Sequence, residues 1–232
     1  MKKNIFFFSF LLLISFSMQA QDVNQLVQKI KAKLDKVNDY EAAGKMKTNV
    51  SFLKVPIATI KIYYKKPGKL KIKNEKGISF VPKGAVNINL ANTLNNGKYS
   101  VLDAGTDKIG GTTVKVVKLL PEDDNSDVVL STLYIDEANL LIKKAKTTTR
   151  DNGTYELEMT YSKYAEYGLP DKVIFSFNTK DYKLPKGVTF DFDDGTTAEK
   201  KPADKGKPKK GKAEITFSSY SINKGVADEV FL

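Results

Sequence analysis

The chain has 232 residues and a formal net charge of +11, and it contains neither histidine nor cysteine. This composition excludes Ser-His-Asp and Cys-His nucleophiles, disulfide bonds and the preferred ligands of zinc. Its basic residues are lysines apart from Arg150. Nucleic-acid sites favour arginine, whose planar guanidinium donates two hydrogen bonds at once, so the positive charge does not indicate a nucleic-acid partner.

Residues 1–20 are predicted to be a cleaved secretory signal peptide. Lys2 and Lys3 form a basic start, an apolar run extends from Ile5 to Phe16, and Ala20 supplies the small residue of a cleavage site. The run is about 12 residues long, whereas a membrane-spanning helix needs about 20. We therefore expect residues 21–232 to form one exported domain.

The segment from Asp22 to Asn38 is predicted to be an amphipathic helix. Its apolar residues recur at helical spacing and form one stripe, made of Val23, Leu26, Val27, Ile30, Leu34 and Val37. Such a stripe fits a helix packed on a core, and it equally fits the inner face of a lid over a cavity. The sequence leaves both interpretations open.

The next segment, from Tyr40 to Phe80, alternates between apolar and polar residues with a period of two, which indicates extended strands. Pro67 and Gly68 lie in a Lys-Lys-Pro-Gly-Lys segment that predicts a chain reversal. The pattern therefore predicts an antiparallel meander with one apolar face and one lysine-rich face.

In the remaining chain, alternation predicts further strands at 99–103, 109–120, 130–136, 140–148, 155–161, 173–177, 188–192 and 213–222. Gly110 and Gly111 form a bend or bulge at the start of the second of these strands. The pair Asn152-Gly153 predicts a two-residue hairpin turn. Residues 199–212 are rich in lysine, proline and glycine and predict a solvated loop. Residues 82–96 fit a short helix, a loop or a strand. The predicted fold class is α+β, mainly β, with a strongly bent antiparallel sheet.

The carboxylates do not form a convincing metal or catalytic site. Two acidic clusters, Asp123, Asp124 and Asp127, and Asp191, Asp193 and Asp194, lack the glycine and distal glutamate spacing of a helix–loop–helix calcium site. Glu156 and Glu158 are formally a carboxylate pair for glycoside hydrolysis, but a spacing of two on a strand indicates a solvated face. We expect no metal, no cofactor and no enzymatic activity.

The apolar strand face is the candidate functional surface. One helix of about 17 residues does not cover a sheet of about ten strands, so either other segments such as 85–94 fill the space or an acyl chain occupies it. Each buried methylene group of such a chain contributes about 0.8 kcal/mol. The expected lining residues share one strand phase: Met46, Val50, Phe52, Ile60, Ile62, Tyr64, Leu70, Ile72, Phe80, Tyr155, Met159, Tyr161, Phe175 and Phe177.

Several motifs in chain order carry a resemblance to a known family. After the amphipathic helix come Asp39, Tyr40, Ala42 and Gly44, then YYKKPGKLKI at 63–72, VKVVKLLP at 114–121 and LYID at 133–136. The hairpin LIKKAKTTTRDNGTYELEMTY at 141–161, IFSF at 174–177 and YSINKGVADEVF at 220–231 follow. In this order they resemble the periplasmic outer-membrane lipoprotein carrier family, which has the LolA-like fold.

The resemblance implies an incomplete barrel of about eleven antiparallel strands with a lid. It also implies a monomeric periplasmic carrier that takes acylated lipoproteins or lipids from an inner-membrane release complex to the outer membrane. Relatives of this fold that sense envelope stress supply the alternative, an adaptor that binds a protein partner and carries no cargo. Carriers of the family latch the lid with an arginine on an early strand, whereas Arg150 lies far along this chain, so no latch residue is assigned.

Overall fold

The structure, a computed structural model, describes residues 23–50, 53–54, 57–76, 94, 98–151, 153–178 and 210–232. The predicted signal peptide lies outside these residues. Helix α1 (Val23–Leu34) confirms the amphipathic helix, and it buries Val23, Leu26, Val27 and Ile30. It ends before the predicted end at Asn38, and the chain then turns so that the backbone N–H of Val37 donates to the carbonyl of Leu34 at 3.1 Å.

Eleven strands form one antiparallel sheet in the order β4-β3-β1-β11-β10-β9-β8-β7-β6-β5, with β2 paired to β1 off this path. The strands are β1 (Asp39–Val50), β2 (Leu53–Lys54), β3 (Ala58–Lys65), β4 (Lys69–Lys76), β5 (Tyr99–Ile109), β6 (Thr112–Pro121), β7 (Val128–Asp136), β8 (Leu141–Thr149), β9 (Gly153–Thr160), β10 (Lys172–Asn178) and β11 (Lys210–Ile222). Two 3-10 turns, η3 (Ala165–Tyr167) and η4 (Asp228–Phe231), complete the described elements.

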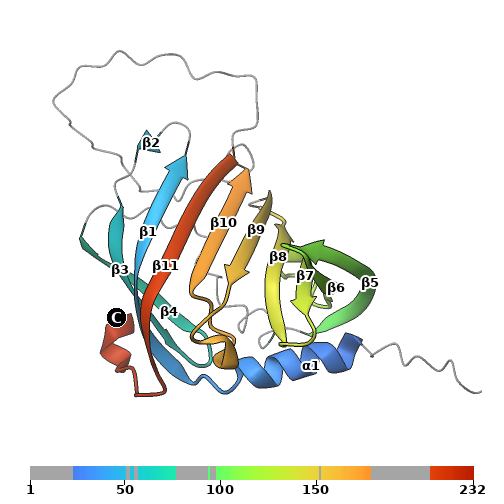
Figure 1. The fold of residues 1–232 in the computed structure, drawn as a ribbon, viewed down its shortest axis with the longest axis horizontal. Helices are drawn as coiled ribbons and strands as arrows, with labels where there is room; N and C mark the ends of the chain where they lie inside the picture. Colours follow the sequence, from blue (N-terminus) through green and yellow to red (C-terminus); the bar gives the residue numbers. More distant parts are fainter. Residues whose placement is uncertain are drawn as a thin grey trace, which may run out of the picture.

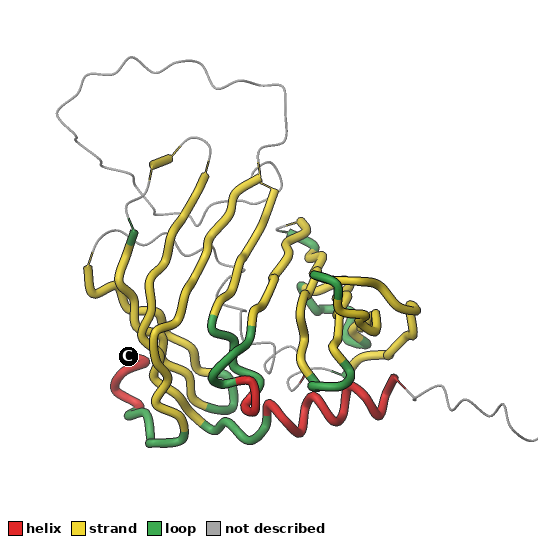
Figure 2. Tube along the Cα trace, viewed as in Figure 1, coloured by secondary structure: helices red, strands yellow, loops and turns green. Residues whose placement is uncertain are grey.

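The sheet is strongly curved, and α1 lies across one end of it (Figure 1). The tube view shows the same arrangement, with the strands bending around a common interior and the helix across the end of the sheet (Figure 2). The edge strands β4 and β5 do not pair with each other, so the sheet is not closed into a barrel. The predicted fold class, a mainly β incomplete barrel with an N-terminal helix, is therefore confirmed.

The strand registers align one buried residue from each of seven strands along the inner face. Paired positions run across β1, β11, β10, β9, β8, β7 and β6 as Thr48, Ala213, Phe175, Leu157, Ala145, Leu133 and Val117. All seven are buried. A period-two pattern on each strand thus becomes a continuous row of packed side chains when the strands pair.

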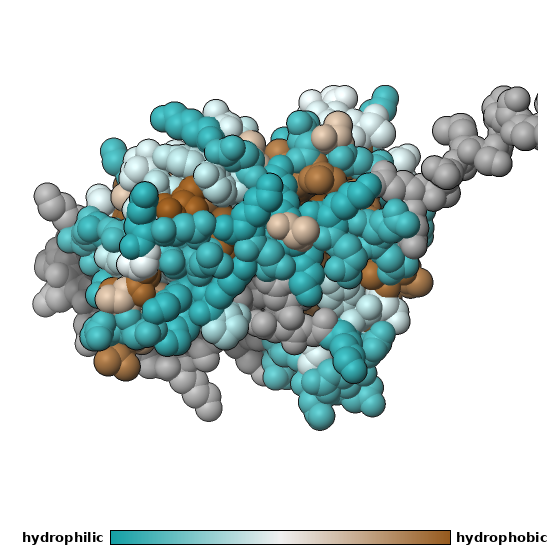
Figure 3. Space-filling view, turned by 90° about the horizontal axis from the view of Figure 1, so that it is seen from below, coloured by the Kyte–Doolittle hydropathy of each residue, from teal (hydrophilic) through white to brown (hydrophobic). Residues whose placement is uncertain are grey.

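The outer face of the sheet carries cross-strand ion pairs. Lys172 Nζ lies 2.9 Å from Glu214 Oε1, joining β10 to β11, and Lys144 Nζ lies 3.2 Å from Glu156 Oε2, joining β8 to β9. The face of the molecule that includes α1 is mainly hydrophilic, with small apolar areas between polar side chains (Figure 3). The division into an apolar and a lysine-rich face was predicted for residues 40–80, and β3 shows it, since its residues alternate between buried and half-buried positions and Lys61 Nζ lies 3.1 Å from Glu41 Oε1 of β1.

Three predicted boundaries are wrong. The strand expected to end at Asp103 continues to Ile109, because a bulge and the positive φ of Gly105 (82°) redirect the chain without ending its pairing with β6. The loop between β8 and β9 has three residues, since Thr149 pairs with Gly153. The strand expected from 213 begins at Lys210, so the last three residues of the predicted loop 199–212 belong to β11.

Other predictions fall outside the described residues: the segment 82–96 apart from the buried Leu94, the strand at 188–192, the acidic cluster at 191–194 and most of the lysine-rich loop. The acidic turn at 121–127 is described. Arg150 holds its backbone, because its guanidinium donates to the carbonyls of Ser126 (3.0 Å) and Asp124 (2.8 Å). The arginine therefore supports a turn between strands.

Candidate binding pocket

The predicted lining residues lie in three hydrophobic clusters. Those of β9 and β10 pack with α1, namely Tyr155, Met159, Phe175 and Phe177, with Tyr161 at the margin. Those of β1, β3 and β4 form a second cluster, namely Met46, Ile60, Ile62, Leu70 and Ile72, and Tyr64 belongs to a third with Val37 and Leu169. Phe52 and Phe80 are outside the described residues, as is the side chain of Val50.

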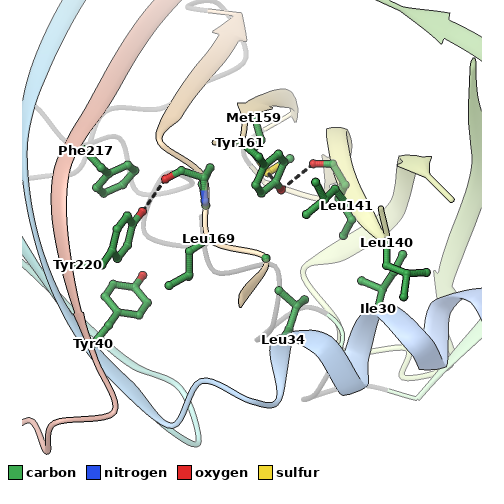
Figure 4. Close-up of a pocket in the computed structure, with 13 residues that line it drawn as sticks. Ile30, Leu34, Tyr40, Leu140, Leu141, Met159, Tyr161, Leu169, Phe217 and Tyr220 are labelled. Atoms are coloured by element: carbon green, nitrogen blue, oxygen red, sulfur yellow. Dashed lines mark hydrogen bonds between the residues drawn. The ribbon is translucent and has the colours of Figure 1, made fainter. Parts of the chain in front are cut away.

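A cavity of about 60 Å³ opens between α1 and the sheet. Its described lining consists of aliphatic and aromatic side chains, one methionine, one glycine and one proline: Ile30, Leu34, Tyr40, Leu140, Leu141, Ile142, Met159, Tyr161, Gly168, Leu169, Pro170, Phe217 and Tyr220. Figure 4 shows Tyr40, Phe217 and Tyr220 at one end, and Ile30, Leu140 and Leu141 at the other. An apolar site without charged side chains suits a hydrocarbon ligand.

Among the predicted residues, only Met159 and Tyr161 line this cavity. The prediction missed Phe217 and Tyr220 because they are three residues apart, which breaks the alternation of a strand. The register between β1 and β11 shifts between Ala43 and Gly44, so that Ala43 opposes Ser219 while Gly44 opposes Phe217. This bulge turns both aromatic rings inward, and an aromatic pair spaced by three within a strand pattern is the signal that would have indicated it.

Two close approaches shape the pocket. The Cβ of any larger residue at Gly168 would lie 2.8 Å from Leu34 Cδ2, and Gly168 also has a positive φ of 67°, so this position requires glycine to let α1 lie close to η3. On the opposite side, Lys33 Nζ donates to the carbonyl of Asn139 at 2.7 Å and links α1 to the β7–β8 turn. The helix is thereby held near Leu140 and Leu141.

Tyrosine hydroxyls supply the polar atoms of the lining. Tyr161 donates to the carbonyl of Ile142 at 2.8 Å, and Tyr220 donates to the carbonyl of Pro170 at 2.8 Å. Burial raises the pKa of the Tyr40, Tyr161 and Tyr220 phenols above the ordinary value, and the neighbouring Tyr40 adds to the pKa shift of Tyr220. All three phenols are therefore neutral at physiological pH, and Tyr161 and Tyr220 act as O–H donors.

The acidic residues that the structure describes do not form a metal site. Among them, no group of His, Cys, Asp and Glu side chains is placed to hold a metal ion, and no helix is long and apolar enough to cross a membrane. Glu156, one of the two carboxylates on β9, is paired with Lys144 on the outer face, away from the cavity.

No protein-family model matches the chain, and the comparison with curated proteins finds no significant match. Solved structures do match. An outer membrane lipoprotein-sorting protein domain from Vibrio parahaemolyticus superposes with a TM-score of 0.57 at 12% identity, over 89% of this chain and 94% of that chain. A LolA superfamily protein from Nitrosomonas europaea gives a TM-score of 0.55 at 12% identity, over 89% and 97%.

A DUF1329 family protein from Desulfovibrio piger gives a TM-score of 0.58 at 13% identity, over 90% of this chain and 95% of that chain. At these identities the likeness concerns the fold, and it extends over nearly the full length of each relative. The order of the strands, the open sheet and the helix across its end thus agree with the resemblance found in the sequence motifs. The chain has the LolA-like fold.

Proposed function

We propose that this protein is a periplasmic carrier that binds the acyl chains of lipoproteins or lipids and moves them from the inner to the outer membrane, without catalysis. The observation that carries the proposal is the pocket between α1 and the inner face, whose lining has no charged side chain. An apolar pocket covered by an amphipathic helix would shield hydrocarbon from water during transit.

The size of the cavity sets a condition on this function. Ligand pockets usually measure about 300–1,000 Å³, whereas this one measures about 60 Å³ and would admit only part of an acyl chain. Uptake of a whole chain therefore requires α1 to move away from the sheet. The predicted lining residues that pack beneath α1, such as Tyr155 and Phe175, would then contact the chain.

The polar contacts described between the C-terminal part of α1 and the rest of the chain are partly exposed. Beyond the contact of Lys33 with Asn139, Lys66 Nζ lies 3.3 Å from Asp35 Oδ1 just past the helix end. Partly exposed contacts of this kind each contribute at most about 1 kcal/mol. The main resistance is the burial of Leu26, Val27 and the other apolar residues of α1, and an entering acyl chain would replace those apolar contacts.

The direct test is native mass spectrometry of protein purified gently from the periplasm, combined with lipid extraction of the same sample. Added mass that matches acyl lipid or lipoprotein would support the carrier and identify its cargo. A polypeptide that stays bare after incubation with lipid or lipopeptide would refute the carrier.

A pair of helix variants makes the test specific. Leu34→Asp places a carboxylate in the apolar lining, and Ala32→Asp places one on the exposed side of the same helix. We expect Leu34→Asp to weaken lipid binding more than tenfold, since an unpaired charge is costly to bury, and Ala32→Asp to bind as the parent does. Equal binding by both variants would show that the lipid lies elsewhere.

The alternative function is that of an adaptor for a protein partner. Exposed large apolar side chains on three neighbouring strands favour it: Leu102 on β5 is 50% exposed, Leu120 on β6 is 37% exposed and Val129 on β7 is 47% exposed. Isolated exposed apolar residues are common on monomeric proteins, so this observation weighs less than the enclosed pocket.

A further inference from the structure

The pocket contains one tyrosine hydroxyl that has no hydrogen bond to the described residues. Of its three tyrosines, Tyr161 and Tyr220 donate to backbone carbonyls, as described above. The hydroxyl of Tyr40 has no hydrogen bond within the described part of the chain, although this residue lines the same cavity. Tyr40 is half-buried, so this hydroxyl is free to donate to a group that enters the cavity.

The ring of Tyr40 is fixed in place by its neighbours. Its centroid lies 5.3 Å from that of Tyr64 on β3 and 5.5 Å from that of Tyr220 on β11, the latter in an edge arrangement. Tyr40 also pairs directly with Tyr64 in the strand register. These two aromatic contacts hold the ring, so the hydroxyl is positioned before any ligand arrives.

The two ends of the pocket differ in character. Figure 4 places Tyr40 with Phe217 and Tyr220 at one end, its hydroxyl directed to the side where Leu169 lies, and Ile30 and Leu140 at the aliphatic end. A ligand that fits both ends has a hydrocarbon part and one acceptor oxygen. Among the described residues, no cationic side chain lines the cavity, so a carboxylate would find no partner among them, whereas a neutral carbonyl needs only one donor.

We propose that the Tyr40 hydroxyl donates to the neutral carbonyl oxygen of an acyl ester or amide, so that the cargo binds with its ester or amide end at Tyr40 and its hydrocarbon at the aliphatic end. This inference rests on the proposed carrier function and adds a chemical class to it. It distinguishes acylated molecules from both free fatty-acid anions and plain hydrocarbons.

The test compares two probes on the full-length mature protein, methyl dodecanoate and dodecane, each displacing a fluorescent naphthylamine dye. In the parent protein both should displace the dye, the ester more tightly. Tyr40→Phe keeps the ring and should weaken ester binding by about five- to tenfold, the loss of one neutral hydrogen bond, while dodecane binding stays unchanged. The matched control is Tyr63→Phe. Tyr63 is the next tyrosine in the chain and lies on β3 outside the described lining, so this change should leave the binding of both probes unchanged.

Infrared spectroscopy provides a second readout that does not depend on affinity. With a carbon-13 label in the ester carbonyl, binding to the parent protein should shift its stretch to lower frequency, and Tyr40→Phe should abolish the shift. Equal loss of both probes in Tyr40→Phe, or an ester shift that persists in it, would overturn the proposal. A parent protein that binds neither probe would instead refute the carrier function itself.

Discussion

Replacement of Gly44 by alanine is expected to destabilise the fold by about 3 kcal/mol, at the upper end of the usual cost of overpacking. Gly44 lies on β1 opposite Phe217 of β11, where the first and last strands meet. A Cβ at this position would lie 2.6 Å from the carbonyl oxygen of Thr216 and 3.3 Å from Phe217 Cα. Both atoms belong to the backbone, so relief requires β1 and β11 to separate.

For a domain of this length, such a loss corresponds to a fall of about 6–12 °C in Tm. Thermal and urea unfolding followed by circular dichroism would measure it. Because Phe217 lines the pocket, the same variant should also weaken displacement of the apolar dye.

The control is Gly105→Ala. Gly105 has a φ of 82°, and no atom lies within 4 Å of the added Cβ. The Gly105→Ala variant should therefore lose only about 1–2 kcal/mol of folding stability through backbone strain, and it should still bind the dye. If Gly44→Ala unfolded with the parent midpoint, the close approach of β1 and β11 and the bulge that orients the pocket aromatics would both be wrong.

Three further results are expected. Thr48→Val should raise the free energy of unfolding by about 1 kcal/mol, because the buried Oγ1 has no hydrogen-bond partner among the described residues; a loss in urea denaturation would mean that an acceptor exists. Gly168→Ala should cost about 1–2 kcal/mol through its positive φ and displace Leu34, and unchanged stability and dye affinity would contradict the account of the α1–η3 contact. Burial raises the pKa of Tyr40, Tyr161 and Tyr220 above 10.0, so the unfolded chain loses these protons first, and stability should hold below pH 10 and fall above it by up to about 1.4 kcal/mol per pH unit for each tyrosine. Alkaline melting curves would check this, and stability that stays level through pH 11 would refute it.

The sequence predicted those parts of the fold in which one pattern persists. Alternation in β1, β3 and β9 gave both the strand and the buried face, since each strand is solvated on one side and packed on the other. The stripe of α1 gave the helix in the same way. The prediction failed where a single residue changes the phase, as at the bulge opposite Ala43 and Gly44 and at Gly105 in β5.

The pocket depends on such irregular positions. Leu140 has a positive φ of 52° in the β7–β8 turn, Leu169 and Pro170 follow η3, and Phe217 lies at the bulge. None of these residues lies in a regularly alternating part of a strand. The alternation of apolar and polar residues therefore predicted side chains of the sheet core, and only Met159 and Tyr161 of that set line the pocket. Tyr40 was in phase, but a single sequence does not show that its hydroxyl lacks a partner.

The ion pairs on the outer face bear on how the strands find their alignment. A slip of two residues between neighbouring strands would keep every apolar side chain inside, because the side-chain period is two. In the native register each ion pair is diagonal, because Lys172 lies opposite Thr216 and Lys144 lies opposite Glu158, so a slip of two residues in one direction would place each lysine directly opposite its glutamate. The apolar pattern therefore determines which face of each strand is buried, and the alignment has to come from features that do not repeat every two residues, such as the bulge between Ala43 and Gly44.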